Sequence, residues 1–171
     1  MIILLMGVTG SGKSTVGSEL AEKLNIGFID ADDFHPKENI AFMSEGKPLN
    51  DEMRKPWLES IAQVIKQHCK AKEDLVLACS ALKRSYRNTL FIESKHHVLI
   101  YLKGSRDEIE SRLQRRTDHF MPSNMLDSQL ATLEEPKADE NVFDIPLSLS
   151  VNQAVSKIIS YLEESERKEL T

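Results

Sequence analysis

The sequence is poor in cysteine and has no long apolar run. Its 171 residues include only two cysteines, Cys69 and Cys79, and their spacing is not that of a zinc site. Both stand in apolar patterns, so we expect small buried side chains in a reducing compartment rather than a disulfide. No apolar run approaches the ~20 residues of a membrane span, and Ile2–Met6 is too short for a signal segment. These absences predict a cytoplasmic protein without a membrane partner.

An excess of positive charge is also missing. Lysine and arginine number 22 against 27 acidic residues, which gives a formal net charge of −5. This balance argues against a nucleic-acid partner, so an anionic ligand has to be held by a local basic pocket. The length predicts one domain over residues 1–171, and the 40% of hydrophobic residues is ordinary for a globular protein.

Glycine is scarce, yet three of the seven glycines fall between residues 7 and 12. Gly7–Ser14 matches G-x-x-x-x-G-K-[ST], the phosphate-binding P-loop, at every fixed position. Ile2–Met6 before it has the pattern of a buried strand, and the apolar residues from 16 to 24 recur every four positions, as in a helix. The alternative is a glycine-rich turn without a ligand, but both flanks agree with the motif. The segment therefore predicts a site for a nucleoside triphosphate.

The chemistry of this loop suits phosphate. Glycine lets backbone N–H groups point inward, and the following helix adds the positive end of its dipole. Lys13 supplies a cation for the terminal phosphates, and the Ser14 hydroxyl can ligate Mg²⁺. The predicted nucleotide-binding residues here are Gly7, Thr9, Gly10, Ser11, Gly12, Lys13, Ser14 and Thr15.

Further β-type runs occur at residues 26–30, 74–79, 97–102 and 147–151, with helical patterns between them. One helical stripe runs from Trp57 to Cys69, with Pro56 placed in its first turn. Strands that alternate with helices predict an α/β fold with a mostly parallel sheet covered on both faces.

The second strand ends in Asp30-Ala31-Asp32-Asp33-Phe34-His35-Pro36. Ligands collect beyond the carboxyl ends of parallel strands, so carboxylates here would face the P-loop. A phosphotransferase needs groups at this place that ligate Mg²⁺ and accept the proton of the substrate hydroxyl. The alternative is a turn rich in helix-capping residues. His35 gains a functional interpretation only through Asp32 beside it.

Two basic segments are further candidates. Arg54 could bind a carboxylate with two hydrogen bonds, or could pair with Asp51 or a neighbouring glutamate at the surface. Lys83 and Arg87 follow the third strand one helical turn apart, which suits a ligand site or a solvated face.

A basic cluster also ends the helix near Arg112–Pro122. Its arginines could close over the triphosphate as a lid, predicted at about residues 114–134, or could bond the last carbonyls of the helix.

Taken in order, these segments resemble the gluconokinases of the thermoresistant type, a family of P-loop kinases. The resemblance rests on GVTGSGKST, DADDFHP, GKPLNDEMRKPWL, ACSALKRSYR, YLKGS and HFMPSNMLDSQLATLEEP. It implies transfer of phosphate from ATP to the 6-hydroxyl of D-gluconate with Mg²⁺. It also implies a three-layer fold with strand order 2-3-1-4-5 and a mobile lid. Dimers are common in the family, so the resemblance admits a homodimer, whereas the residues themselves give no sign of one.

The resemblance also implies roles for single residues. The catalytic residues would be Lys13, Asp32 and Arg116, and the metal would be held by Ser14 and Asp30. The substrate would be bound by Asp32, His35, Arg54, Lys83, Arg87 and His119, and Arg112 would lie on the adenine side. Met125-Leu126 stands where the family suggests Leu-Leu, a volume-conserving exchange.

Two other functions are open at this stage. A related small-acid kinase, such as a shikimate kinase, shares the fold and the phosphate loop. A GTPase-like switch would carry an Asn-Lys-x-Asp motif on a late strand, and the stretch from Leu147 to Val155 has none.

Overall fold

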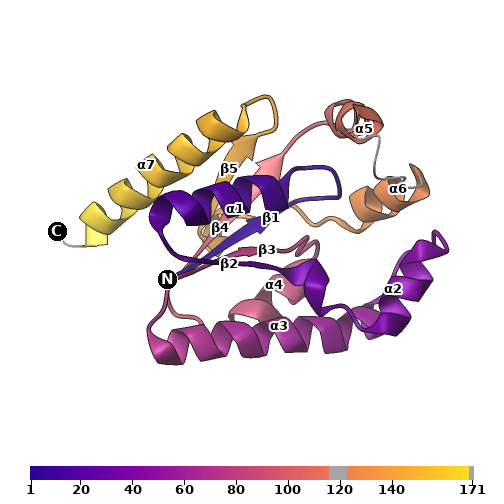
Figure 1. Ribbon diagram of the computed structural model, residues 1–171, viewed down its shortest axis with the longest axis horizontal. Coiled ribbons are helices and arrows are strands. Elements are labelled where there is room, and N and C mark those ends of the chain that lie inside the picture. The colour runs from indigo at the N-terminus through magenta and orange to yellow at the C-terminus, as the bar shows by residue number, and fades with distance from the viewer. Residues whose placement is uncertain (116–122, 170–171) are drawn as a thin grey trace.

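The computed structural model describes residues 1–115 and 123–169 (Figure 1). Its centre is a sheet in the order β2-β3-β1-β4-β5, in which every neighbouring pair is parallel. The strands are β1 (Ile2–Met6), β2 (Gly27–Asp30), β3 (Leu75–Ala78), β4 (His97–Lys103) and β5 (Val142–Pro146). The predicted fold class and strand order are confirmed.

Helices cover both faces of the sheet, which makes three layers (Figure 1). One face carries α1 (Lys13–Leu24) and α7 (Val151–Glu169), and the other carries α3 (Asp51–Ala71) and α4 (Arg84–Phe91). The remaining elements are η1 (Ala31–Phe34), α2 (Lys37–Ser44), α5 (Arg106–Arg115), α6 (Ser123–Thr132) and η2 (Ala138–Glu140). Among them, α2, α5 and α6 lie toward the end of the molecule to which β1 points (Figure 1).

The middle strand, β1, is the most buried part of the sheet. Ile2–Met6 are at most 1% exposed, because β3 and β4 pair with the strand on either side and helices cover both faces. A strand buried on both faces is apolar throughout rather than alternating, which is why IILLM reads as one continuous run. The P-loop leaves the carboxyl end of this strand and therefore starts from a rigid support.

The predicted fifth strand at 147–151 is wrong. The strand is Val142–Pro146, and the following residues form a turn and the start of α7. L-S-L-S-V alternates like a strand, but Ser150 caps the helix. The Gln153 N–H donates to Ser150 Oγ at 3.2 Å, and the Ser150 N–H donates to the Gln153 side chain at 2.9 Å.

The predicted start of the long helix is also wrong. α3 begins at Asp51, where the Asn50 side chain accepts the Met53 N–H at 2.9 Å. Pro56 therefore lies inside the helix and not in its first turn. The N-cap asparagine decided the boundary, because its side chain satisfies a donor that the first helical turn leaves unpaired.

Cys69 and Cys79 are both free thiols. Cys79 follows β3 in the interior, where burial raises the pKa of its thiol to about 12. Over the two described ranges, no helix has the length and apolar character that a membrane crossing requires.

Candidate active site

The loop between β1 and α1 has the backbone of a phosphate cradle. Gly10 and Gly12 adopt φ values of +79° and +88°, which side-chain-bearing residues rarely reach. A Cβ at Gly10 would also stand 2.8 Å from Leu113 of α5. α1 begins without a side-chain cap and without an acidic residue in its first turn. The start of this helix therefore presents the positive end of its dipole without a carboxylate in the first turn, which favours an anion.

Two side chains of this loop fit a triphosphate. The Lys13 ammonium donates to the Val8 carbonyl at 3.1 Å, which places the cation beside the loop. Ser11 Oγ is buried and has no hydrogen-bond partner among the described residues. A buried hydroxyl without a partner is costly unless a ligand completes it. These observations agree with the predicted nucleotide site.

Ser14 and Asp30 meet at the start of α1 and the end of β2. The Ser14 hydroxyl donates to Asp30 Oδ2, and Asp30 Oδ1 accepts the Asp32 N–H at 3.0 Å. A hydroxyl and a carboxylate oxygen suit Mg²⁺, which usually takes one or two protein ligands and completes its shell with water and phosphate oxygens. Within residues 1–115 and 123–169, no cluster of three or more acidic, histidine or cysteine ligands exists that would hold a metal alone. The pair therefore fits a metal that arrives with the nucleotide.

Asp32 follows Asp30 and opens to solvent. Its side chain is 79% exposed, so the carboxylate is accessible to a ligand. Neighbouring residues partly desolvate the Asp32 carboxylate, which raises its pKa. The negative charges of Asp30 and Asp33 raise this pKa further, and the positive charge of Lys13 lowers it. A carboxylate with a raised pKa is better suited to hold a proton than an ordinary surface aspartate.

His35 is a packed side chain rather than an open ligand group. It is 6% exposed and stacks on Trp57 with ring centroids 4.2 Å apart. Burial, and then the charge of Arg54, lowers the pKa of His35 to about 4. The ring is therefore neutral at pH 7, and its 3.8 Å approach to Asp32 is not an ion pair at that pH. Trp57 is fixed in turn by its Nε1–H, which donates to the Ala31 carbonyl at 2.7 Å.

A polar groove of about 570 Å³ opens between the start of α3 and the start of α4. It is lined by Leu49, Asn50, Asp51, Glu52, Arg54, Lys83 and Thr132. Arg54 is only 9% exposed and donates to the Tyr86 hydroxyl at 3.1 Å. The hydrogen-bond partner of Arg54 is thus a buried phenol. The alternative from the sequence, an ion pair with Asp51 or a neighbouring glutamate at the surface, is not what the structure shows.

The carboxylate of Asp51 belongs to the lining of this groove. It accepts two contacts of 3.1 Å from the Lys83 ammonium and one hydrogen bond from the Tyr86 hydroxyl. The bond from Tyr86, followed by the bond from Lys83, lowers the pKa of Asp51. Lys83, Tyr86 and Arg54 therefore converge on a place that already holds one carboxylate.

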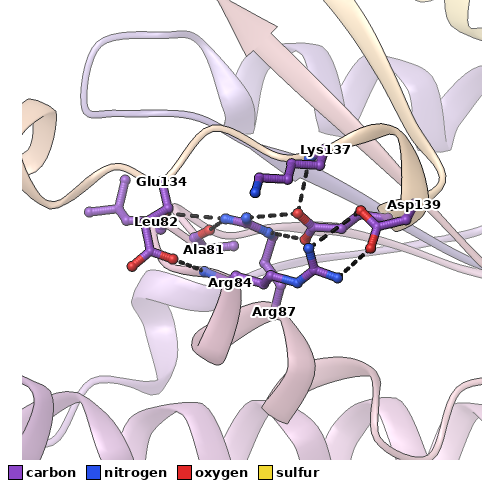
Figure 2. A network of polar contacts seen from close by, with 8 residues as sticks. Ala81, Leu82, Arg84, Arg87, Glu134, Lys137 and Asp139 are labelled. Atoms are coloured by element: carbon purple, nitrogen blue, oxygen red, sulfur yellow. Dashed lines mark hydrogen bonds and ion pairs between the residues drawn. The ribbon is translucent and has the colours of Figure 1, made fainter.

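The structure separates Arg87 from Lys83, although the sequence suggests one shared face. Lys83 precedes α4 and lines the groove, whereas the Arg87 side chain is 2% exposed and turns inward. Its guanidinium bonds both oxygens of Glu140, at 2.6 and 3.1 Å, and donates to the Ala81 carbonyl at 2.9 Å. Figure 2 shows this network between α4 and the segment 134–140. The prediction of one cationic face is therefore wrong, because Lys83 precedes α4 and lines the groove, whereas Arg87 lies within α4 and is buried.

The basic cluster after α5 is described in part. Arg112 donates to the Leu147 carbonyl, and one of its nitrogens stands 3.4 Å from the position of a Cβ at Gly12. Arg112 thus lies beside the P-loop, and its place on the adenine side stays a prediction. Arg116 and His119 fall outside the described residues, as does the part of the predicted lid between 116 and 122.

Three groups at the site were not predicted as such. Asp51 lines the groove, Tyr86 donates its hydroxyl hydrogen bond to Asp51, and Gln129 of α6 accepts the Thr9 N–H at 2.6 Å. Asp51 entered the sequence analysis only as a partner for Arg54. A usable signal existed for Gln129, since it stands in the SQLATLEEP segment that carries part of the family resemblance.

Comparisons with known proteins agree with this geometry. The family model described as shikimate kinase matches residues 9–163. A probable gluconokinase of Xenopus tropicalis is 44% identical, with 98% of this chain and 95% of the relative aligned. The thermoresistant gluconokinase of Escherichia coli K12 is 43% identical, with 93% and 89% aligned. The crystal structure of a gluconokinase from Sinorhizobium meliloti superposes with a TM-score of 0.90 at 38% identity, over 98% of this chain and 94% of that chain. The chain therefore belongs to the gluconokinase family of P-loop kinases.

Proposed function

We propose that this protein transfers the γ-phosphoryl group of ATP to the 6-hydroxyl of D-gluconate, giving ADP and 6-phospho-D-gluconate. The observation that carries the proposal is the groove lined by the two cations Arg54 and Lys83, in a chain that aligns with gluconokinases over most of its length. Gluconate is a carboxylate with several hydroxyls, so its site has to combine cations with groups that accept hydroxyl protons.

On the nucleotide side, the P-loop amides and Lys13 would hold the β- and γ-phosphates. Mg²⁺, when bound with ATP, would neutralise charge on the phosphate oxygens, with Ser14 and Asp30 as its protein ligands. Arg112 would bind on the adenine side. Arg116 and His119 lie outside the described residues; Arg116 would act in catalysis and His119 would bind the substrate, as the resemblance implies.

On the acceptor side, Asp32 would orient the 6-hydroxyl and receive its proton as the oxygen bonds to phosphorus. The bond from phosphorus to the β–γ bridging oxygen breaks in the same displacement, and ADP leaves. The exposure of Asp32 and the raised pKa of its carboxyl support this role. His35, neutral and stacked on Trp57, would form the wall that holds the Asp32 segment.

Lys83 and Arg54 would bind the carboxylate of gluconate. Both line the groove, and Lys83 already holds a carboxylate there, that of Asp51. Arg87 does not line the groove and is bonded to Glu140, so we assign it to positioning of α4 rather than to substrate contact.

A kinase for a different small acid is the second candidate, because the matching family model is that of shikimate kinase. A coupled assay of ADP release with D-gluconate, with shikimate and without an acceptor separates the two. We expect turnover with D-gluconate only, and formation of the 6-phosphate identifies the hydroxyl. Turnover of shikimate without turnover of gluconate would overturn the proposal.

We also propose that the protein is cytoplasmic, which agrees with its two free thiols.

A further inference from the structure

Gln129 connects α6 to the P-loop over 120 positions of sequence. Its side-chain oxygen accepts the Thr9 N–H at 2.6 Å. A backbone N–H can only donate, so the oxygen end of the carboxamide has to face Thr9. The –NH₂ end, which can only donate, is then directed away from this bond. The side-chain oxygen of Gln129 is thus bonded to the P-loop, and its –NH₂ group is left to donate to another acceptor.

The same helix borders the acceptor groove. Thr132, three residues after Gln129, lines the groove together with Lys83 and Arg54. Residues three apart share a face of a helix. One face of α6 therefore runs from the P-loop, which takes the phosphate donor, to the groove, which takes the acceptor. The transferred phosphoryl group has to pass between these two places.

We propose that Gln129 contacts the reacting groups, a role that rests on the proposed kinase function. Its oxygen stays on the Thr9 N–H, while its –NH₂ group donates to an oxygen at the junction of the two sites. That oxygen belongs to the terminal phosphate or to the acceptor hydroxyl. A neutral donor here stabilises negative charge on the transferring group without competing for Lys13.

A purely structural role makes a different prediction, and Gln129→Glu separates the two. The new carboxylate keeps the size of the side chain and accepts the Thr9 N–H, so a structural role survives the change. The proposed role does not, because the donors are lost and a negative charge enters beside phosphate. We expect kcat of Q129E to fall about 10²- to 10³-fold at pH 8, the effect of removing one preorganised donor. Its activity relative to wild type should rise as the pH is lowered, since a protonated glutamate donates again.

Ser128→Ala is the matched control. Ser128 precedes Gln129 on α6, and its main-chain carbonyl accepts a hydrogen bond from the Thr132 hydroxyl at 2.8 Å. We expect kcat of S128A within about twofold of wild type, because the substitution removes one hydroxyl and leaves Gln129 and its bond to Thr9 in place. Thermal denaturation of both variants checks that α6 stays in place.

Nucleotide affinity without gluconate identifies the source of the oxygen. If it belongs to the terminal phosphate, Q129E binds ATP at least about tenfold more weakly while ADP binding changes little, one charge-assisted hydrogen bond being involved. If it belongs to the acceptor, both nucleotides keep their affinity and the loss appears in gluconate KM and kcat. Q129E with wild-type turnover across the pH range, or S128A as impaired as Q129E, overturns the assignment. A wild-type enzyme that does not phosphorylate gluconate overturns the proposed function instead.

Discussion

Replacing Glu140 with glutamine removes one charge from an ion pair that is almost fully buried. The side chains of Arg87 and Glu140 are 2% and 9% exposed, and two N–H···O contacts of 2.6 and 3.1 Å join them (Figure 2). Loss of one partner leaves the other charge buried and uncompensated, which costs about 3–5 kcal/mol. A chain of this size loses roughly 2–4 °C of Tm per kcal/mol, so E140Q should melt about 10 °C below wild type.

The neighbouring pair supplies a matched control. Asp139 accepts from Arg84 at 2.6 Å, but these side chains are 61% and 40% exposed. Both pairs join α4 to the same short segment, and each loses one carboxylate charge in its asparagine or glutamine variant. Because an exposed pair contributes about 0–1 kcal/mol, D139N should stay within about 1 kcal/mol of wild type. Urea denaturation followed by circular dichroism gives both free energies of unfolding.

The stability lost in E140Q should also depend on pH. Burial by itself raises the pKa of Glu140, but hydrogen bonds from Arg87 and the Lys137 N–H, with the charges of Arg87 and Arg84, outweigh it and hold the pKa below the ordinary 4.5. A lowered pKa contributes stability above the unfolded value, and this is lost as the pH falls through the folded value. The difference in free energy of unfolding between wild type and E140Q should have its full value at pH 7 and should shrink below about pH 4.5. An E140Q deficit no larger than that of D139N, or one that persists unchanged in acid, would refute the reasoning.

Three further variants test the proposed catalytic groups. Lys13→Ala should lower turnover by orders of magnitude with an unchanged circular dichroism spectrum, since the cation acts on the phosphates and not on the core; near-native turnover would remove Lys13 from the site. Asp32→Asn should reduce kcat far more than ATP affinity, and unchanged steady-state rates would contradict its role. Lys83→Met should raise the KM for gluconate about 10- to 100-fold, the effect of one charge-assisted hydrogen bond, and leave the KM for ATP unaltered; equal shifts in both constants would place Lys83 elsewhere.

The parts of the site that sequence predicts well are those encoded locally. The P-loop is eight consecutive residues, and its strand and helix flank it directly. Ser14 and Asp30 meet because parallel strands end at one edge of a sheet: Ser14 lies at the start of the helix after β1, and Asp30 is the last residue of β2. The error at 147–151 is of the same local kind, because an alternating L-S-L-S run fits both a strand and the approach to a helix cap.

The parts that sequence does not predict depend on partners far along the chain. The Arg87 side chain points inward because its guanidinium donates to both carboxylate oxygens of Glu140, which is 53 residues later in the chain. Gln129 is joined to Thr9 across 120 residues. Helical spacing shows that Lys83 and Arg87 are one turn apart, but it does not predict that Lys83 precedes the helix while the Arg87 side chain is buried in the interior. Long-range polar pairs are therefore where reasoning from a single sequence fails first.

The composition of the groove bears on the kind of acceptor that it can take. Around Asp51 stand an ammonium, a buried guanidinium and a phenol, and no aromatic side chain is among the described lining residues. A nucleobase would desolvate these charged groups without offering them an opposite charge, which is costly. A hydroxylated carboxylate instead supplies an anion for Lys83 and Arg54 and hydroxyls for Asp51. The same groups thus favour a sugar acid and disfavour the base of a nucleoside, which is how a fold shared with other P-loop kinases becomes selective for a different acceptor.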